Sequence, residues 1–118
     1  MDRNLRDSLL LRGFRRCDIC GNHLPADIWE AHHRRLRSQG GPDEAANLLS
    51  IDHQCHWRAH HWRDWARDRG YIVHAGSDFA IRPVWRHGQS WQIPTPDGWT
   101  ACEPPADIDL SLTERNAA

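Results

Sequence analysis

The stretch NLLSIDHQCHWRAH, residues 47–60, decides the fold of this chain. Its apolar run at 48–51 is short and predicts a buried strand. A helix is expected over 53–69, because that range contains neither Gly nor Pro and Gly70 stands where the residue after a helix belongs. The stretch therefore predicts a buried strand that leads almost directly into a helix rich in histidine.

The sequence on either side of this stretch predicts short elements. Leu5 and Leu9 stand about one helical turn apart, and Gly13 ends the amphipathic segment to which they belong. Clustered glycine and proline at 38–43 predict a loop. The expected elements are a helix at 4–12, an extended segment at 28–33, and short strands at 71–74, 80–85 and 91–93.

We expect an α+β fold built around one small core. The 118 residues leave room for a single modest hydrophobic core. After Glu103 the chain is rich in proline, aspartate and alanine, which predicts a loosely ordered tail. The expected parts are an N-terminal helix at 1–13, a core at 14–70, a short β-strand extension with a hairpin at 71–102, and the tail at 103–118.

The composition is poor in apolar residues and unusual in its basic ones. Hydrophobic residues make up 39% of the chain and the mean hydropathy is -0.78, which predicts extra stabilisation by a metal or a partner. All 15 basic residues are arginine, which excludes a Schiff-base lysine and the lysine of a phosphate-binding loop. The net charge is -1, but 12 of the arginines lie before Gly76, so the positive charge is concentrated in the first two-thirds of the chain.

The distribution of apolar residues also bears on location. No run approaches the roughly 18 apolar residues of a membrane span, and the first residues lack the apolar centre of a signal peptide. We therefore expect no membrane association and a cytoplasmic location. In that compartment the cysteines are expected to act as thiolate ligands rather than to form disulfides.

Three cysteines have the spacing of a structural zinc site. Cys17 and Cys20 form a C-x-x-C turn followed by glycine, and Cys55 lies further along the chain. A structural zinc normally takes four ligands, so one more is needed. Asp52 stands where the first cysteine of a second C-x-x-C pair ending at Cys55 would stand, so it fits the spacing best. His53 beside it is the softer ligand. The candidates for the fourth position are Asp52, His53 and His23.

Histidines form a second set with ligand spacing. His56 and His60 are four residues apart, so they share a helix face and can bind one divalent ion together. His32 and His33 are adjacent on an extended segment, where successive side chains point to opposite faces. One of this pair can bind the same ion, while the other stays free as a general base with a pKa of about 6.5.

Taken in order, these motifs resemble the HNH endonucleases, in particular the small ones encoded by bacteriophages and prophages. The resemblance covers residues 14–70 and implies the ββα-metal fold for this core. Besides the cysteine turn, it rests on EAHHRR at 30–35, RSQGG at 37–41, NLL at 47–49, and CH at 55–56 followed by His60.

The resemblance implies a role for each histidine of the second set. His33 matches the general base that deprotonates the attacking water, and Asn47 matches the asparagine that orients the loop carrying that base. His32, His56 and His60 match the ligands of one divalent catalytic metal, which could be Mg, Mn, Ni or Zn.

The resemblance also implies a structural zinc site for the cysteines. Three arginines are expected to contact phosphates of the substrate. The three cysteines, Cys17, Cys20 and Cys55, match the structural zinc ligands of the cysteine-bearing members, with Asp52 standing where a fourth cysteine is usual. Arginines close after the base are expected to contact phosphates with bidentate hydrogen bonds. These arginines are Arg34, Arg35 and Arg37.

The function implied is that of a metal-dependent endonuclease that hydrolyses phosphodiester bonds of DNA, by nicking or by double-strand cleavage. For members encoded near packaging genes, the resemblance adds a role in phage DNA packaging with a terminase as partner, in the cytoplasm of the host cell. The alternative is a zinc-stabilised module that binds nucleic acid or docks to a protein without catalysis.

Overall fold

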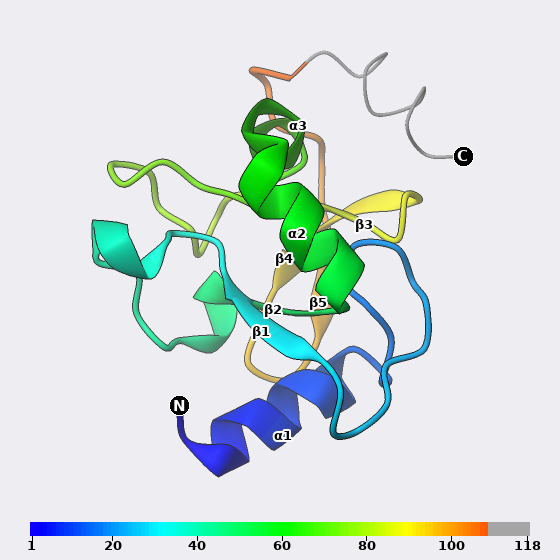
Figure 1. Cartoon of the computed structure of the whole chain (residues 1–118). Helices are drawn as coiled ribbons and strands as arrows, with labels where there is room; N and C mark the ends of the chain where they lie inside the picture. The colour runs from blue at the N-terminus through cyan, green and yellow to red at the C-terminus, as the bar shows by residue number, and fades with distance from the viewer. Residues whose placement is uncertain (109–118) are drawn as a thin grey trace.

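The strand and the start of the helix expected from residues 47–60 are both present in the computed structural model, which describes residues 1–108. Strand β2 (Leu48–Ile51) is buried along its whole length and pairs antiparallel with β1 (Glu30–His33). Only Asp52 separates β2 from helix α2 (His53–His61), which packs beside β1 (Figure 1). Two further α-helices, two short 3-10 helices (Arg37–Gln39 and Ala45–Asn47) and a three-stranded sheet complete the fold of the described residues. The expected α+β class is thereby confirmed.

The single helix expected over 53–69 is wrong, because the chain breaks at Trp62. The backbone angles of Trp62 are φ -110° and ψ 68°, outside the helical region, so α2 stops there and a separate helix α3 (Arg63–Asp68) follows. Ala66 on α3 is completely buried. Gly70 does end the helical segment as expected, with a left-handed φ of 79°.

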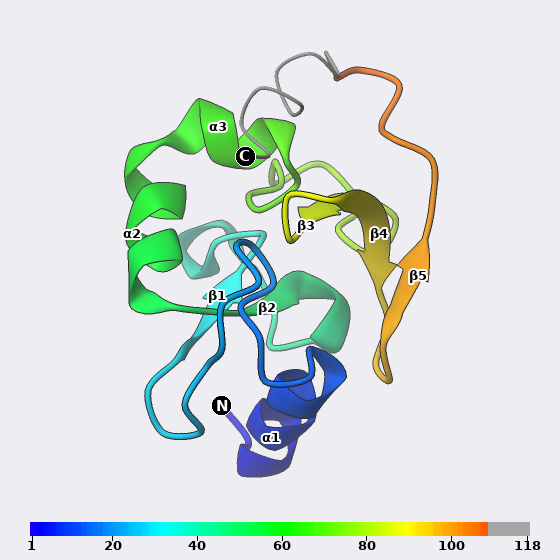
Figure 2. The same cartoon turned by 90° about the vertical axis from the view of Figure 1, so that its right-hand side faces the viewer.

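A second sheet lies on the other side of the molecule from α2 (Figure 2). Its first two strands form a hairpin whose turn residues, His87 and Gly88, both have positive φ, as tight hairpin turns require. The sheet is antiparallel throughout. Its strands are β3 (Val84–Arg86), β4 (Ser90–Pro94) and β5 (Trp99–Ala101).

Three expectations for this region are corrected by the structure. The strand expected at 80–85 is shorter, since residues 80 and 81 lie in a turn and β3 begins at Val84. Residues 71–74 form no strand: the amides of Tyr71 and Ile72 donate to the Ala66 carbonyl of α3, and the Val73 amide donates to the Arg34 carbonyl at 2.9 Å. The strand β5 was not expected, because the segment between Gly98 and Cys102 is only three residues long. In the tail expected at 103–118, residues 103–108 form no helix or strand, and 109–118 lie outside the described part of the chain.

Helix α1 (Arg3–Arg12) covers one end of the core. The side chain of Asp2 caps it by accepting a hydrogen bond from the Asn4 amide at 3.3 Å, and Leu9 and Leu10 are buried on its inner face. The helix expected at 4–12 is thereby confirmed. This is the longest helix among residues 1–108, and none there has the length and apolar character of a bilayer-spanning segment.

A buried carboxylate ties the cysteine turn to both flanking regions. Asp18 is fully buried, its Oδ1 lies 3.4 Å from Nη2 of Arg86 on β3, and Arg12 supplies a second positive charge nearby. Burial raises the pKa of Asp18 to about 6, although both arginines lower it. Arg12 also donates to the Leu48 carbonyl at 2.7 Å, so the same network joins α1 to β2.

Candidate functional site

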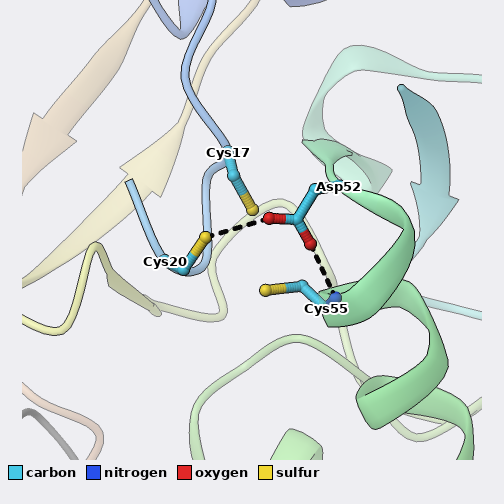
Figure 3. Close-up of side chains that lie close together, drawn as sticks. All are labelled: Cys17, Cys20, Asp52 and Cys55. Atoms are coloured by element: carbon cyan, nitrogen blue, oxygen red, sulfur yellow. Dashed lines mark hydrogen bonds between the residues drawn. The ribbon is translucent and has the colours of Figure 1, made fainter. Parts of the chain in front are cut away.

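Four side chains from two distant segments converge at the N-terminal end of α2 (Figure 3). Cys17 and Cys20 come from the turn after α1, while Asp52 and Cys55 come from the start of α2. Their ligand atoms all lie within 4.8 Å of one another. Three thiols and one carboxylate form a complete four-donor set, so this cysteine cluster could hold a metal ion such as zinc.

The cysteine turn is held in place by pairing with β2. The Asp18 amide donates to the Ser50 carbonyl at 2.8 Å, and the Ser50 amide donates to the Asp18 carboxylate, also at 2.8 Å. Gly21 closes the turn with a left-handed φ of 81° and donates to the Cys17 carbonyl. Since α2 follows Ser50 almost at once, this pairing brings both ends of the cluster together.

The structure places Asp52, and neither alternative, at the fourth position of the cysteine cluster. One carboxylate oxygen accepts from the Cys55 amide at 2.7 Å and so caps α2, while the other lies 3.1 Å from the sulfur of Cys20. His53 is 87% exposed and faces Glu30 at 3.4 Å. His23, which forms a bridge with Arg16, also lies outside the cluster.

The three thiols lie close enough together to shift one another's pKa values in different directions. Contacts from Cys17 and Cys55 lower the pKa of Cys20 to about 2, while the contact with Cys20 raises the pKa of Cys17 to about 12. Contacts with the other two thiols also raise the pKa of Cys55. Thiolate charge therefore concentrates on Cys20, and a cation binding here would release the protons of the two buried thiols.

A second group, the histidine cluster, forms where α2 packs beside β1. It consists of His32 from β1 and of His56 and His60 from α2, with ligand atoms again within 4.8 Å of one another. The Nε2 atoms of His56 and His60 lie 3.0 Å apart. Burial lowers the pKa of His60, and the neighbouring His56 lowers it further, so an uncharged imidazole is favoured.

The orientation of His32 leaves one nitrogen free to bind a metal. Its Nε2 donates to the Tyr71 carbonyl at 2.7 Å, so Nδ1 carries the lone pair. This Nδ1 is buried and has no hydrogen-bond partner in the described part of the chain. Burial lowers the pKa of His32 to about 3, which keeps the ring neutral. A buried, neutral and unpartnered nitrogen is well suited to a metal ligand.

Glu30 supports the same cluster and was missed from the sequence. Its Oε2 lies 2.9 Å from Nδ1 of His56, which leaves the Nε2 of that ring for the cluster. A carboxylate behind a ligating histidine orients the ring and makes it a better ligand. The signal was available, because Glu30 stands two residues before His32 and therefore on the same face of β1.

His33 lies outside the histidine cluster and contacts a carboxylate instead. Its Nε2 is 2.7 Å from Oδ1 of Asp43, and the Nε of Arg37 approaches the same ring nitrogen at 3.5 Å. The bond to His33 holds the pKa of Asp43 below its usual range. Asp43 was not expected in the site, since it lies in the loop expected at 38–43 and shares no element with His33.

Asn47 holds together the two segments that carry His33 and Asp43. Its side-chain oxygen accepts from the Arg35 amide at 2.8 Å, and its nitrogen donates to the carbonyls of Arg35 and Pro42 at 3.2 and 3.1 Å. Arg35 lies two residues after His33, and Pro42 directly precedes Asp43. The fully buried Asn47 therefore sets the position of the imidazole relative to the carboxylate.

The chain matches no protein-family model, no curated protein and no solved structure. The chemistry of the two clusters is therefore inferred from their own atoms and from the surface beside them. A groove of about 680 Å³ opens next to the histidine cluster, and all three cluster histidines and His33 line it. Three arginines from separate elements line it as well: Arg6, Arg37 and Arg63.

The structure corrects the arginines expected to contact phosphate. Arg34 is fully buried and donates to four backbone carbonyls, including that of Gly70 at 2.8 Å, so it is out of reach of a substrate. Arg35 is half-buried, donates to the Ser77 carbonyl and lies against the Phe79 ring. Of the three, only Arg37 has an exposed side chain, at 67%, and lines the groove.

Proposed function

We propose that this chain is a metal-dependent endonuclease of the HNH type that hydrolyses phosphodiester bonds in DNA. The observation that carries the proposal is the arrangement at the groove: three histidines form a cluster, and a fourth, His33, faces the same groove from outside it. Three protein ligands leave a coordination position open, which is typical of catalytic rather than structural sites. A binding module needs neither the open position nor the additional imidazole.

The histidine cluster fits a divalent ion by its own donor chemistry. Nδ1 of His32 is buried and has no hydrogen-bond partner in the described part of the chain, and the Glu30 carboxylate lies 2.9 Å from Nδ1 of His56. An ion bound here would polarise a phosphate oxygen and stabilise the negative charge on the leaving oxygen. The Tyr71 carbonyl and the Glu30 carboxylate keep two of the rings in the orientation that binding requires.

His33 is the general base in this proposal, and Asp43 decides which of its nitrogens acts. A carboxylate only accepts hydrogen bonds, so the neutral His33 ring carries its proton on Nε2 and its lone pair on Nδ1. Nδ1 then takes the proton of the attacking water. Asn47 maintains this geometry by holding the segments on both sides of the contact.

The groove also offers a positively charged side chain that can contact a DNA phosphate. Arg37 is exposed beside His33, and its planar guanidinium can donate two hydrogen bonds to one phosphate. The cysteine cluster lies at the start of the same helix that presents two of the cluster histidines. A zinc ion there would stabilise the position of α2 without taking part in hydrolysis.

The test is cleavage of supercoiled plasmid DNA by the full chain, with Mg²⁺, Mn²⁺, Ni²⁺ or Zn²⁺ added in turn. Wild type should convert the plasmid to nicked or linear DNA with at least one of these ions. His33→Ala should lower the rate by about 10²–10⁴-fold, the usual contribution of a general base. His61→Ala is the matched control, because His61 stacks on Trp57 and does not line the groove.

Two results would contradict the proposal. Cleavage by His33→Ala at the wild-type rate would remove the catalytic assignment. No cleavage by wild type with any of the four ions, while zinc content and fold are intact, would instead favour a binding module without catalysis.

A further inference from the structure

Two arginines outside the expected site lie beside the histidine cluster. Arg6 belongs to α1 and Arg63 begins α3, and these helices stand at opposite ends of the molecule with β1 and α2 between them (Figure 1). Both side chains nevertheless line the same groove as His33 and the cluster. The groove therefore receives positive charge from both ends of the molecule.

Each of these arginines is held in place by uncharged groups. The guanidinium of Arg6 lies 4.0 Å from the centre of the Trp29 ring and donates to the Trp29 carbonyl at 2.9 Å. The Nε of Arg63 donates to the His60 carbonyl at 3.2 Å. Because these contacts already restrict the side chains, less conformational entropy is lost when they bind a ligand.

Neither arginine is neutralised by a carboxylate. Within residues 1–108, no ion pair involves Arg6 or Arg63, whereas Arg67 on the same helix as Arg63 pairs with Asp64 at 3.4 Å. Glu30 is the one carboxylate that lines the groove within this range, and it faces His56. Two unpaired guanidinium groups beside a metal-type cluster favour an anionic ligand.

We propose that Arg6 and Arg63 bind phosphates of the DNA backbone on the two sides of the bond that is cleaved. The inference rests on the proposed function for the identity of the ligand as DNA. A guanidinium group forms paired hydrogen bonds with a phosphate, and such contacts hold the strand in register without reading its sequence. Arg6 and Arg63 thus take the role expected of Arg34 and Arg35.

The test measures binding separately from cleavage. A fluorescein-labelled duplex of roughly twenty base pairs, at ~3.4 Å per base pair, is longer than the molecule, which extends 37 Å. Its affinity is followed by fluorescence anisotropy at several salt concentrations, in a His33→Ala background so that the duplex stays intact. Arg6→Gln and Arg63→Gln are compared with matched controls on the same helices, Arg3→Gln and Arg67→Gln.

Each groove substitution should weaken binding by roughly tenfold, the effect of losing one hydrogen bond to a charged group. Each should also reduce the slope of log affinity against log salt by about 0.9, the value for one phosphate contact. The two control substitutions should leave both quantities unchanged. Arg6→Lys and Arg63→Lys keep the charge, so they should retain the salt slope even though they lose the paired geometry.

The outcomes separate this inference from the proposed function. If all four glutamine variants bind with the same affinity and slope as their parent, the inference is overturned even when wild type cleaves DNA. If Arg6 and Arg63 contribute to binding but wild type cleaves nothing, the proposed function fails and the phosphate contacts stand. Should Arg6→Gln lower the unfolding temperature, Arg6→Lys and the Arg63 variants decide the result.

Discussion

The cysteine cluster and the histidine cluster share helix α2, but they differ in completeness and in what lies beside them. The cysteine cluster has four donors and does not line the groove, whereas the histidine cluster has three and opens on it. Structural zinc sites are closed by four protein ligands, and catalytic sites keep one position open. Under the proposed function, this difference gives the first cluster a structural role and the second cluster a catalytic one.

One helix serves both clusters because neighbouring positions point in different directions. Cys55 and His56 are adjacent, but successive side chains on an α-helix are about 100° apart. Cys55 therefore faces the cysteine turn, while His56 faces β1 and Glu30. Any shift in the position of α2 would disturb both groups, so a stable cysteine cluster is a condition for a working histidine cluster.

The largest effect should come from breaking the cysteine cluster. Structural zinc binding contributes about 10–16 kcal/mol in small zinc-dependent peptides, which is comparable to the whole stability of a typical domain at about 5–15 kcal/mol. Cys55→Ala should therefore abolish cooperative thermal unfolding when it is followed by circular dichroism. Cys102→Ala is the control, since Cys102 belongs to neither cluster. A wild-type unfolding curve for Cys55→Ala would remove the structural role of the cluster.

A smaller effect, confined to the histidine cluster, is expected from Glu30→Gln. The change removes the negative charge behind His56 but keeps the shape of the side chain, so metal affinity and cleavage should fall by about 10–100-fold. The unfolding temperature should stay within a few degrees of wild type. Glu44→Gln serves as the control, because Glu44 does not line the groove and makes no side-chain capping bond. Full activity of Glu30→Gln would show that His56 needs no carboxylate behind it.

The smallest effect should come from Asp43, which contacts His33 at 2.7 Å and Arg37 at 3.5 Å but belongs to neither cluster. Asp43→Ala removes the acceptor for the Nε2 proton, so kcat should fall by about tenfold with little change in KM. Asp43→Asn can still accept a hydrogen bond from the Nε2–H group through its side-chain oxygen, so its kcat should lie between those of Asp43→Ala and wild type. Nitrogen chemical shifts from NMR report the tautomer directly. Equal populations of His33 tautomers in wild type and Asp43→Ala would contradict the positioning role.

The elements that the sequence predicts best are those marked by a local pattern of apolar residues. Strand β2 follows from its apolar run, and α1 follows from the periodicity of its leucines. The break at Trp62 was not predicted because no Gly or Pro marks it. The strand β5 was not predicted because it is only three residues long, although a turn with Gly98 precedes it. Both depend on packing between segments that are distant in sequence.

The sequence predicts those residues of the candidate site that lie on one helix or strand, because their spacing shows which side chains share a face. The i, i+4 spacing brings His56 and His60 together, but nothing in the sequence links Asp43 to His33, since they meet through a loop. Arg34 was misassigned although a signal existed. The alternation that turns His32 inward also turns Arg34 inward two residues later, where backbone carbonyls hold it.

The central claim, that the two clusters bind metal for different purposes, is tested most directly by counting bound ions with native mass spectrometry. Wild type should keep one zinc after dialysis against a chelator and take up a second ion when Ni²⁺ is added. His60→Ala should keep the zinc, remain folded and fail to take up the second ion. Uptake of the second ion by His60→Ala, or a folded wild-type protein without zinc after dialysis, would contradict the account.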